Sequence, residues 1–253
     1  VRVCRVSVDD ELFFGVIEND AVALLTGHPF GDFAPEGRVL RLSDVRLVAP
    51  VLPSKVIAVG RNYAEHAREM GAAVPAAPLI FLKPSTSVIG PGEPIALPWQ
   101  SEQVEHEAEL AVVIGRLCRD VPEERVPEVV FGYTCANDVT ARDLQASDGQ
   151  WGRAKGFDTF CPLGPWIETD LDIDDAGVAC VVNGQQRQSG STADMVRDVA
   201  ELVSWISSVM TLLPGDVILT GTPAGVGPLV AGDEVSVSID GIGTLTNPVV
   251  DRD

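Results

Sequence analysis

The 253-residue sequence is short of positive charge. It has 18 lysines and arginines against 37 aspartates and glutamates, a formal net charge of −19. A surface with this surplus of negative charge repels phosphate backbones, so we expect no nucleic-acid partner. Long apolar runs are also missing: none approaches the roughly 20 residues that a membrane-spanning helix needs, so we expect no membrane association.

Cysteine pairs and phosphate-binding loops are absent as well. The glycine-rich segment 221–227 lacks the Gly-Lys-Ser/Thr of a phosphate loop, so we expect its backbone to approach a pocket instead. No C-x-x-C pair occurs, and the cysteines are odd in number and widely spaced, which is typical of reduced core residues in a cytoplasmic protein. They are Cys4, Cys118, Cys135, Cys161 and Cys180.

The residues that are present predict an α+β fold with a mainly β core. Residues 1–50 alternate apolar and polar around the turn-forming Asn19-Asp20, the period-two pattern of short antiparallel strands. Because strands outnumber helices without regular alternation, a doubly wound sheet is not expected. We predict a small β-rich N-terminal domain, residues 1–50, and a main domain, residues 53–253. In the main domain we expect strands at 55–60, 79–82, 110–114, 129–135, 217–220 and 234–239, and helices at 62–70 and 195–213.

The strongest chemical signal is the pair Glu107 and Glu109, which precedes the apolar run 110–114. Residues two apart on a strand point to one face, so both carboxylates should project together from the edge of the core. Two like charges there are unfavourable unless a cation neutralises them or one is protonated. Oxygen ligands favour Mg²⁺, Mn²⁺ or Ca²⁺ over Zn²⁺. The alternative is an exposed strand end with two solvated carboxylates.

Two further segments could complete such a site. Asp138 follows the strand expected at 129–135, where a third ligand can lie, and Arg142 comes one helical turn later. His66 and Glu69, three residues apart on the helix expected at 62–70, are neighbours on one face. A carboxylate beside an imidazole orients the ring and favours it as a base. The alternative for this pair is a solvated helix face.

Six segments in a fixed order carry a resemblance to a known family. They are 60–70 (GRNYAEHAREM), 81–85 (FLKPS), 106–110 (HEAEL), 137–143 (NDVTARD), 155–158 (KGFD) and 219–223 (LTGTP). Over about residues 53–250 the sequence resembles the fumarylacetoacetate hydrolase family, including its acylpyruvase, oxaloacetate-decarboxylase and hydroxyheptadienedioate-isomerase members. The resemblance implies stacked mixed β-sheets in a roll with a few short helices, a catalytic domain at 53–253, and a homodimer as the common assembly.

The resemblance also implies roles for single residues. The ligands of Mg²⁺ or Mn²⁺, with Ca²⁺ as a further option, would be Glu107, Glu109 and Asp138. The catalytic residues would be His66, Glu69 and Lys155. The substrate contacts would be Arg142, Gln145, Lys155 and Thr222. The three carboxylates are outweighed by a divalent cation together with Lys155 and Arg142, so the pocket would be locally positive and suited to a small anionic keto acid.

Three functions remain open from the sequence. The leading one is C–C bond hydrolysis of acylpyruvates, or decarboxylation of oxaloacetate, through an enolate, with His66 and Glu69 activating water. The second is isomerisation of 2-hydroxyhepta-2,4-diene-1,7-dioate or tautomerisation of oxaloacetate, which needs a proton shuttle but no attacking water. The third is a metal-stabilised scaffold without turnover. The motifs do not separate the first two.

Overall fold

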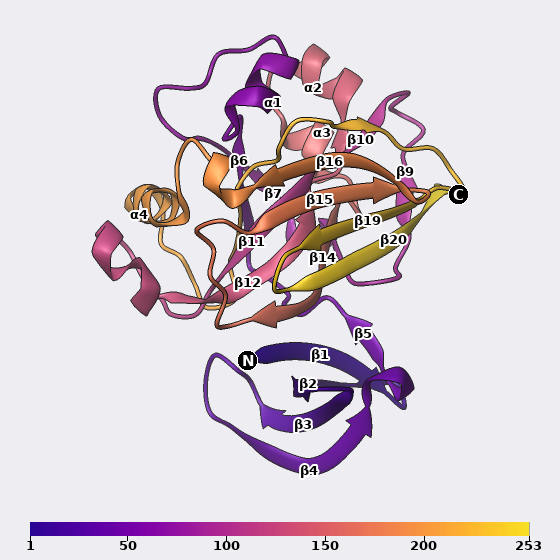
Figure 1. The fold of residues 1–253 in the computed structure, drawn as a ribbon, viewed down its shortest axis with the longest axis vertical. Coiled ribbons are helices and arrows are strands. Elements are labelled where there is room, and N and C mark those ends of the chain that lie inside the picture. Colours follow the sequence, from indigo (N-terminus) through magenta and orange to yellow (C-terminus); the bar gives the residue numbers. More distant parts are fainter. Residues whose placement is uncertain (253) are drawn as a thin grey trace.

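In the computed structural model, which describes residues 1–252, the fold is mainly β, and the expectation of an α+β chain with few short helices is confirmed (Figure 1). The α-helices are α1 (Ala64–Glu69), α2 (Arg142–Asp148), α3 (Gly152–Gly156) and α4 (Val199–Val209). Short 3₁₀ turns cover Leu42–Asp44, Ser85–Ser87, Glu123–Glu128 and Thr192–Asp194.

A 12-stranded sheet runs through the molecule in the order β4-β3-β2-β1-β14-β12-β11-β17-β6-β7, with β5 paired to β1 and β8 to β14. Its N-terminal strands are β1 (Arg2–Val8), β2 (Glu11–Glu18), β3 (Ala21–Gly27), β4 (Phe33–Arg41) and β5 (Arg46–Val48). Its other strands are β6 (Val56–Gly60), β7 (Leu79–Lys83), β8 (Val88–Ile89), β11 (Ala108–Ile114), β12 (Val130–Asn137), β14 (Cys161–Glu168) and β17 (Val217–Leu219).

Two smaller sheets complete the fold. The five-stranded sheet, in the order β16-β15-β19-β20-β9, is built from β9 (Ile95–Leu97), β15 (Gly177–Val182), β16 (Gln185–Ser191), β19 (Glu234–Ile239) and β20 (Gly243–Asp251). The three-stranded sheet, in the order β13-β10-β18, is built from β10 (Val104–His106), β13 (Thr140–Ala141) and β18 (Gly227–Pro228). Strands β11, β12 and β14 pack against β15, β19 and β20, so two stacked sheets enclose the main core.

The N-terminal strands form hairpins of the expected kind and are continuous with the main sheet. Asp9 and Asp10 both have positive φ, 49° and 65°, at the turn between β1 and β2. Asn19, at the expected turn between β2 and β3, has φ 53°. Positive φ in a short turn matches the right-handed twist of the strands it joins. Because β1 pairs with β14, the N-terminal strands extend the large sheet.

Helix α4 is shorter than the expected helix 195–213. It begins after Asp198, whose side chain accepts a hydrogen bond from the Glu201 backbone N–H, and its C-terminal cap Met210 is extended. Met195 is instead held in an antiparallel bridge to Tyr63, so tertiary pairing replaces the first expected turn. The apolar face of α4 is buried in the main core as predicted, because Val199, Leu202, Val203 and Ile206 recur at helical spacing.

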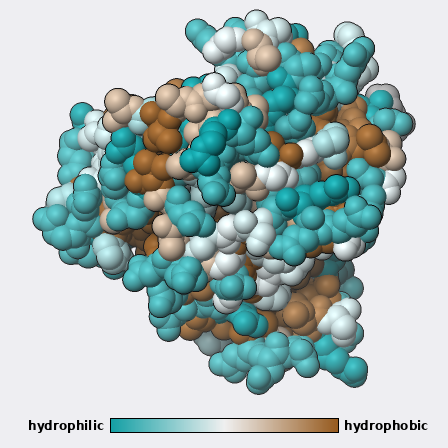
Figure 2. Space-filling model, turned by 45° about the horizontal axis from the view of Figure 1, so that its top comes forward, coloured by the Kyte–Doolittle hydropathy of each residue, from teal (hydrophilic) through white to brown (hydrophobic). Residues whose placement is uncertain are grey.

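The face seen in Figure 2 is mainly hydrophilic, and the cysteines are buried. Within residues 1–252, no helix is long and apolar enough to span a membrane. Hydrophilic residues cover most of the face seen in Figure 2, and hydrophobic residues form separate patches there. All five cysteines are buried and free, which confirms that they are unpaired core residues.

Helices α1, α2 and α3 gather at one end of the stacked sheets (Figure 1). Strand β17 runs toward this end and leads into the glycine-rich segment 221–227. The start of β17 is fixed by Asp216, which is fully buried and pairs with the Lys55 ammonium. Its carboxylate also accepts hydrogen bonds from the Ser54 hydroxyl at 2.6 Å and the Leu213 backbone N–H at 2.8 Å.

We therefore predict that Asp216→Ala lowers the free energy of unfolding by about 3 kcal/mol, because it leaves a largely buried ammonium and a backbone N–H without their partner. Urea denaturation measures this change. The exposed Asp174 provides the control, and Asp174→Ala should shift the free energy of unfolding by no more than about 0.5 kcal/mol. Equal effects of the two substitutions would contradict the anchoring role of Asp216.

Candidate active site

Three buried carboxylates from two adjacent strands meet at the end of the sheet where the short helices gather. Glu107 lies between β10 and β11, Glu109 lies in β11, and Asp138 follows β12 directly. One oxygen from each lies within 4.8 Å of the others, and the three residues are at most 4% exposed. The Asp138 backbone N–H donates to the Glu107 carbonyl oxygen at 2.8 Å, so the ends of the paired strands hold these two residues together.

The local backbone differs in detail from the expectation. Glu107 is not within a continuous strand but at the break between β10 and β11, where its N–H donates to the Asn137 side-chain oxygen at 2.9 Å. Glu107 and Glu109 still project into one cavity. Residues 138–141 are not helical either: the bridge strand β13 pairs with β10, and α2 begins only at Arg142. The solvated-strand-end alternative is wrong, because both glutamates are buried.

Two of the carboxylates have cationic partners. The Lys155 ammonium donates to Glu107 at 2.7 Å and to Asp138 at 2.6 Å, and Arg142 donates to Glu107 at 2.6 Å. Burial alone would raise the pKa of Glu107, but the positive charges of Lys155 and Arg142 outweigh it and hold the pKa below its ordinary value. Burial likewise opposes the Lys155 charge, yet Asp138 and Glu107 raise the pKa of Lys155.

Glu109 lacks a cationic partner. Within residues 1–252 its carboxylate is in no ion pair, and it accepts a hydrogen bond from the Gly221 backbone N–H at 2.7 Å. Burial, followed by the charges of Asp138 and Glu107, raises the pKa of Glu109 well above its ordinary value. A buried carboxylate beside two others is stabilised by a divalent cation, for which carboxylate oxygens are preferred ligands. The three residues therefore fit a divalent-metal site.

Arg142 and Gln145 support the carboxylates. Besides Glu107, the Arg142 guanidinium donates to Glu105 at 2.7 Å and to the Gln145 side-chain oxygen at 2.6 Å. All three guanidinium nitrogens are thus engaged within the protein, and the arginine orients Glu107. Gln145 accepts through its oxygen, which leaves its amide N–H groups for another partner.

His66 and Glu69 form the pair that their spacing predicts. Both lie on α1, and His66 Nδ1 is 3.1 Å from a Glu69 carboxylate oxygen. His66 is 6% exposed. The Gly225 backbone N–H also donates to Glu69, at 3.0 Å. The glycine-rich segment therefore contacts the site at two points, Gly221 and Gly225, as expected of backbone that approaches a pocket.

Thr222 lies in the cavity wall, but its hydroxyl is occupied. It donates to the Ala108 carbonyl oxygen at 2.8 Å and accepts from the Gln188 amide at 2.7 Å. A hydroxyl has one hydrogen and two lone pairs, so in this arrangement Thr222 can only accept a further hydrogen bond. Its predicted substrate contact stays a prediction.

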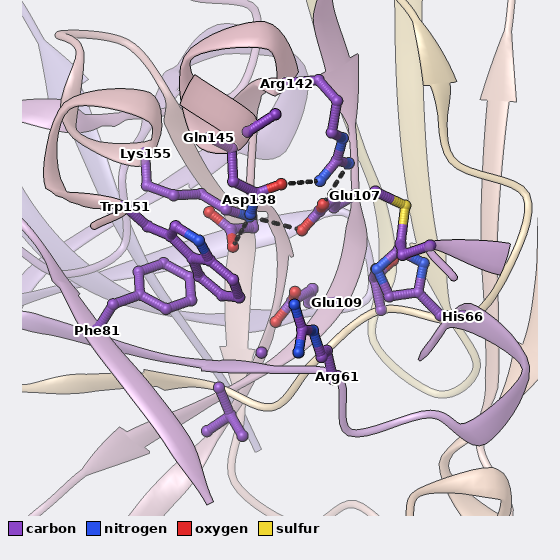
Figure 3. Close-up of a pocket in the computed structure, with 15 residues that line it drawn as sticks. Arg61, His66, Phe81, Glu107, Glu109, Asp138, Arg142, Gln145, Trp151 and Lys155 are labelled. Atoms are coloured by element: carbon purple, nitrogen blue, oxygen red, sulfur yellow. Dashed lines mark hydrogen bonds and ion pairs between the residues drawn. The ribbon is translucent and has the colours of Figure 1, made fainter. Parts of the chain in front are cut away.

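Every site residue expected from the sequence, except Glu69, lines one cavity of about 230 Å³. Figure 3 shows the three carboxylates between Lys155 and Trp151 on one side and His66 on the other. The lining residues that the sequence analysis did not anticipate include Arg61, Met70, Phe81 and Trp151.

Two buried charges next to the cavity were also missed. Lys83, at the end of β7, is 1% exposed and pairs with the second oxygen of Asp138. Glu105 pairs with Arg142. The sequence did contain a signal for Lys83: it is a charged residue at the end of a short apolar strand, immediately before Pro84. Glu105 lies two residues before Glu107, as Glu109 lies two after it, so the same alternation could have included it.

Comparisons with known proteins agree on the family. Residues 55–250 match the family described as fumarylacetoacetate (FAA) hydrolase C-terminal, and residues 1–50 match one described as Rv2993c-like, N-terminal. A 5-carboxymethyl-2-hydroxymuconate delta-isomerase structure from Mycobacterium smegmatis is 55% identical, with a TM-score of 0.94 and full coverage of both chains. Oxaloacetate tautomerase YcgM of Escherichia coli is 47% identical over 74% of this chain and 89% of its own length.

A more distant relative carries a metal. The structure of maleylpyruvate hydrolase from Sphingobium sp. SYK-6, in complex with manganese (II) ion and pyruvate, is 34% identical. Its TM-score is 0.83, and the match covers both chains fully.

We predict that Mn²⁺ at 100 times its dissociation constant raises the free energy of unfolding of the metal-stripped protein by about 2.7 kcal/mol. Glu109→Gln should abolish this increase, because it removes the carboxylate that lacks a cation, and should not destabilise the metal-free protein. Thermal and urea unfolding with and without Mn²⁺ measure both effects.

The exposed Glu65 on α1 supplies a control of equal charge. Glu65→Gln should keep the full Mn²⁺ effect. A Glu109→Gln protein that Mn²⁺ still stabilises as strongly as the parent would rule out the three-carboxylate site.

Proposed function

This chain belongs to the fumarylacetoacetate hydrolase family, and from that premise we propose that it is a divalent-metal-dependent enzyme that interconverts the keto and enol forms of a small 2-keto acid. One observation carries the proposal: His66, oriented by Glu69, faces the same small cavity as three buried carboxylates, one of which has no cationic partner. Relatives named as an isomerase and a tautomerase support a reaction in which a proton is relocated.

Glu107, Glu109 and Asp138 would hold the ion, which we propose is Mg²⁺ or Mn²⁺. The manganese in the maleylpyruvate hydrolase relative supports this choice. When bound, the ion would act as a Lewis acid and stabilise negative charge on the keto oxygen. Lys155 and Arg142 keep Glu107 ionised and in place. Lys83 and Lys155 hold the Asp138 carboxylate in place through ion pairs.

His66 would transfer the proton. Its Nδ1 is engaged by Glu69, so Nε2 is the nitrogen left to remove a proton from C3 of the keto acid. The C–H bond breaks, an N–H bond forms, and the electron pair moves onto the keto oxygen. Return of the proton from Nε2 to that oxygen gives the enol and restores the neutral imidazole.

Two donors would orient the substrate. The Lys155 ammonium has three N–H groups, of which two are used by Glu107 and Asp138, so one is left for a substrate oxygen. The Gln145 amide N–H groups are left in the same way, because Arg142 uses the amide oxygen. The cavity of about 230 Å³ is below the roughly 300–1,000 Å³ usual for ligand pockets, which suits a small keto acid.

The second candidate is cleavage, either hydrolysis of an acylpyruvate or decarboxylation of oxaloacetate. In the hydrolysis, His66 would take a proton from water, and the water oxygen would attack the far carbonyl carbon. The C–C bond between that carbon and C3 of the pyruvate part would then break, its electron pair would leave on the pyruvate enolate, and the proton on His66 would pass to that enolate. The observation in its favour is the double anchoring of Glu69, by His66 and by the Gly225 N–H, which holds the imidazole in one orientation. The named maleylpyruvate hydrolase relative supports it at lower identity.

We predict that the metal-stripped protein speeds the loss of enol-oxaloacetate absorbance only after Mg²⁺ or Mn²⁺ is added, and that no pyruvate is released. A parallel assay of acetylpyruvate should show no cleavage. Metal-dependent release of pyruvate from either acid would select the second candidate instead. Absence of any metal-dependent change with both acids would contradict catalysis on this substrate class and favour a scaffold role.

We further predict that His66→Asn lowers kcat roughly 10²- to 10⁴-fold, the usual contribution of a positioned general base. The stabilisation by Mn²⁺ should persist, because His66 is not among the three carboxylates. Initial rates and Mn²⁺-dependent unfolding measure the two properties on one preparation. Full turnover by a correctly folded His66→Asn protein would remove His66 from the reaction.

A further inference from the structure

Arg61 is a pocket cation that has no carboxylate partner within the described residues. Among residues 1–252, the other cations that line the cavity, Arg142 and Lys155, pair with carboxylates, whereas Arg61 has no ion pair. Its guanidinium carbon lies 5.8 Å from the centre of the Trp151 ring, within the range of a cation–π contact. In the view of Figure 3 it lies at the opposite end of the carboxylate cluster from Arg142.

The backbone holds Arg61 at the cavity at some strain. Its φ is 59°, in the left-handed region that a long side chain rarely adopts. The next residue, Asn62, fixes the turn, because its side chain donates to the Thr220 carbonyl at 2.8 Å and accepts from the Arg197 N–H at 3.0 Å. Because no carboxylate of the described residues pairs with Arg61, its guanidinium N–H groups are left for a ligand in the cavity.

The charged side chains around the cavity indicate the net charge that such a ligand should carry. Apart from the His66–Glu69 pair, four carboxylates (Glu105, Glu107, Glu109 and Asp138) face four cations (Lys83, Lys155, Arg142 and Arg61). The centre is therefore formally neutral, and a divalent ion would leave it with two positive charges. A dianion balances such a centre, whereas a monocarboxylate does not.

We propose that Arg61, supported by the Trp151 ring, forms a subsite for the second carboxylate of a dicarboxylic 2-keto acid. A planar guanidinium can donate two parallel hydrogen bonds to a carboxylate, and its other cationic neighbours in the cavity already have partners. The proposal rests on the proposed function, because it assumes that the keto-acid end of the substrate lies at the carboxylate cluster. It assigns to Arg61 the selection of dicarboxylates over monocarboxylates.

The test compares 2-oxoglutarate with 2-oxopentanoate, which share a five-carbon 2-keto acid chain and differ in the second carboxylate. Calorimetric titration in the presence of Mn²⁺ gives the two dissociation constants. The unmodified protein should bind 2-oxoglutarate roughly ten- to a hundred-fold more tightly, as expected for hydrogen bonds between charged groups. Arg61→Met should weaken 2-oxoglutarate binding to the level of 2-oxopentanoate and leave 2-oxopentanoate and Mn²⁺ binding unchanged.

Two further variants separate charge from geometry. Arg68→Met removes one positive charge from an exposed position on α1, outside the cavity, and should keep the full preference. Arg61→Lys keeps the charge but loses the planar fork, and should retain an intermediate preference.

The outcomes distinguish this inference from the proposed function. If the unmodified protein binds both acids equally well, or if Arg61→Met weakens both acids alike, the subsite is wrong while the keto-acid site stands. A loss of Mn²⁺ affinity in Arg61→Met with the preference intact would also overturn the subsite. If neither acid binds the Mn²⁺-loaded protein, the proposed function itself fails.

Discussion

Mutual repulsion among three buried carboxylates is the constraint on which the arrangement around the site depends. With oxygens within 4.8 Å of one another, each pair of ionised carboxylates repels by at least about 3.5 kcal/mol at an effective dielectric constant of about 20. Three such pairs approach the whole net stability of a typical domain, roughly 5–15 kcal/mol. The chain meets this constraint with compensating groups from four separate segments: Lys83 from β7, Arg142 from α2, Lys155 from α3 and the Gly221 N–H after β17.

His66 is held by tertiary contacts rather than by its own helix. Helix α1 has six residues, too few to be stable alone. Its entry is fixed by the bridge between Tyr63 and Met195, and Glu69 is fixed by the Gly225 N–H near its end. These contacts join residues more than 100 positions apart, so the orientation of His66 depends on the complete fold. The carboxylates differ in this respect, because paired strands of the large sheet position them directly.

The sequence was sufficient for features that short-range periodicity or a compact motif encodes. Alternation predicted the N-terminal hairpin at Asn19, and the spacing of Glu107 and Glu109 predicted that both point into one site. Prediction from the sequence failed where contacts between distant segments determine the structure. The first expected turn of the helix 195–213 is replaced by the pairing of Met195 with Tyr63, and the ion pair between Lys83 and Asp138 joins residues 55 positions apart. Neither of these two pairings can be predicted from the local sequence pattern.

The observed pairings also change how the site must recognise an anion. Arg142 and Lys155 were expected to contact the substrate, and both also pair with carboxylates, as Lys83 does. Without a metal, the cavity around Glu109 therefore offers no surplus of positive charge to a keto acid, and the protein as a whole repels one at a net charge of −19. The proposed metal would thus couple two binding events: the ion that relieved repulsion at Glu109 would also supply the positive charge that the proposed anionic substrate requires.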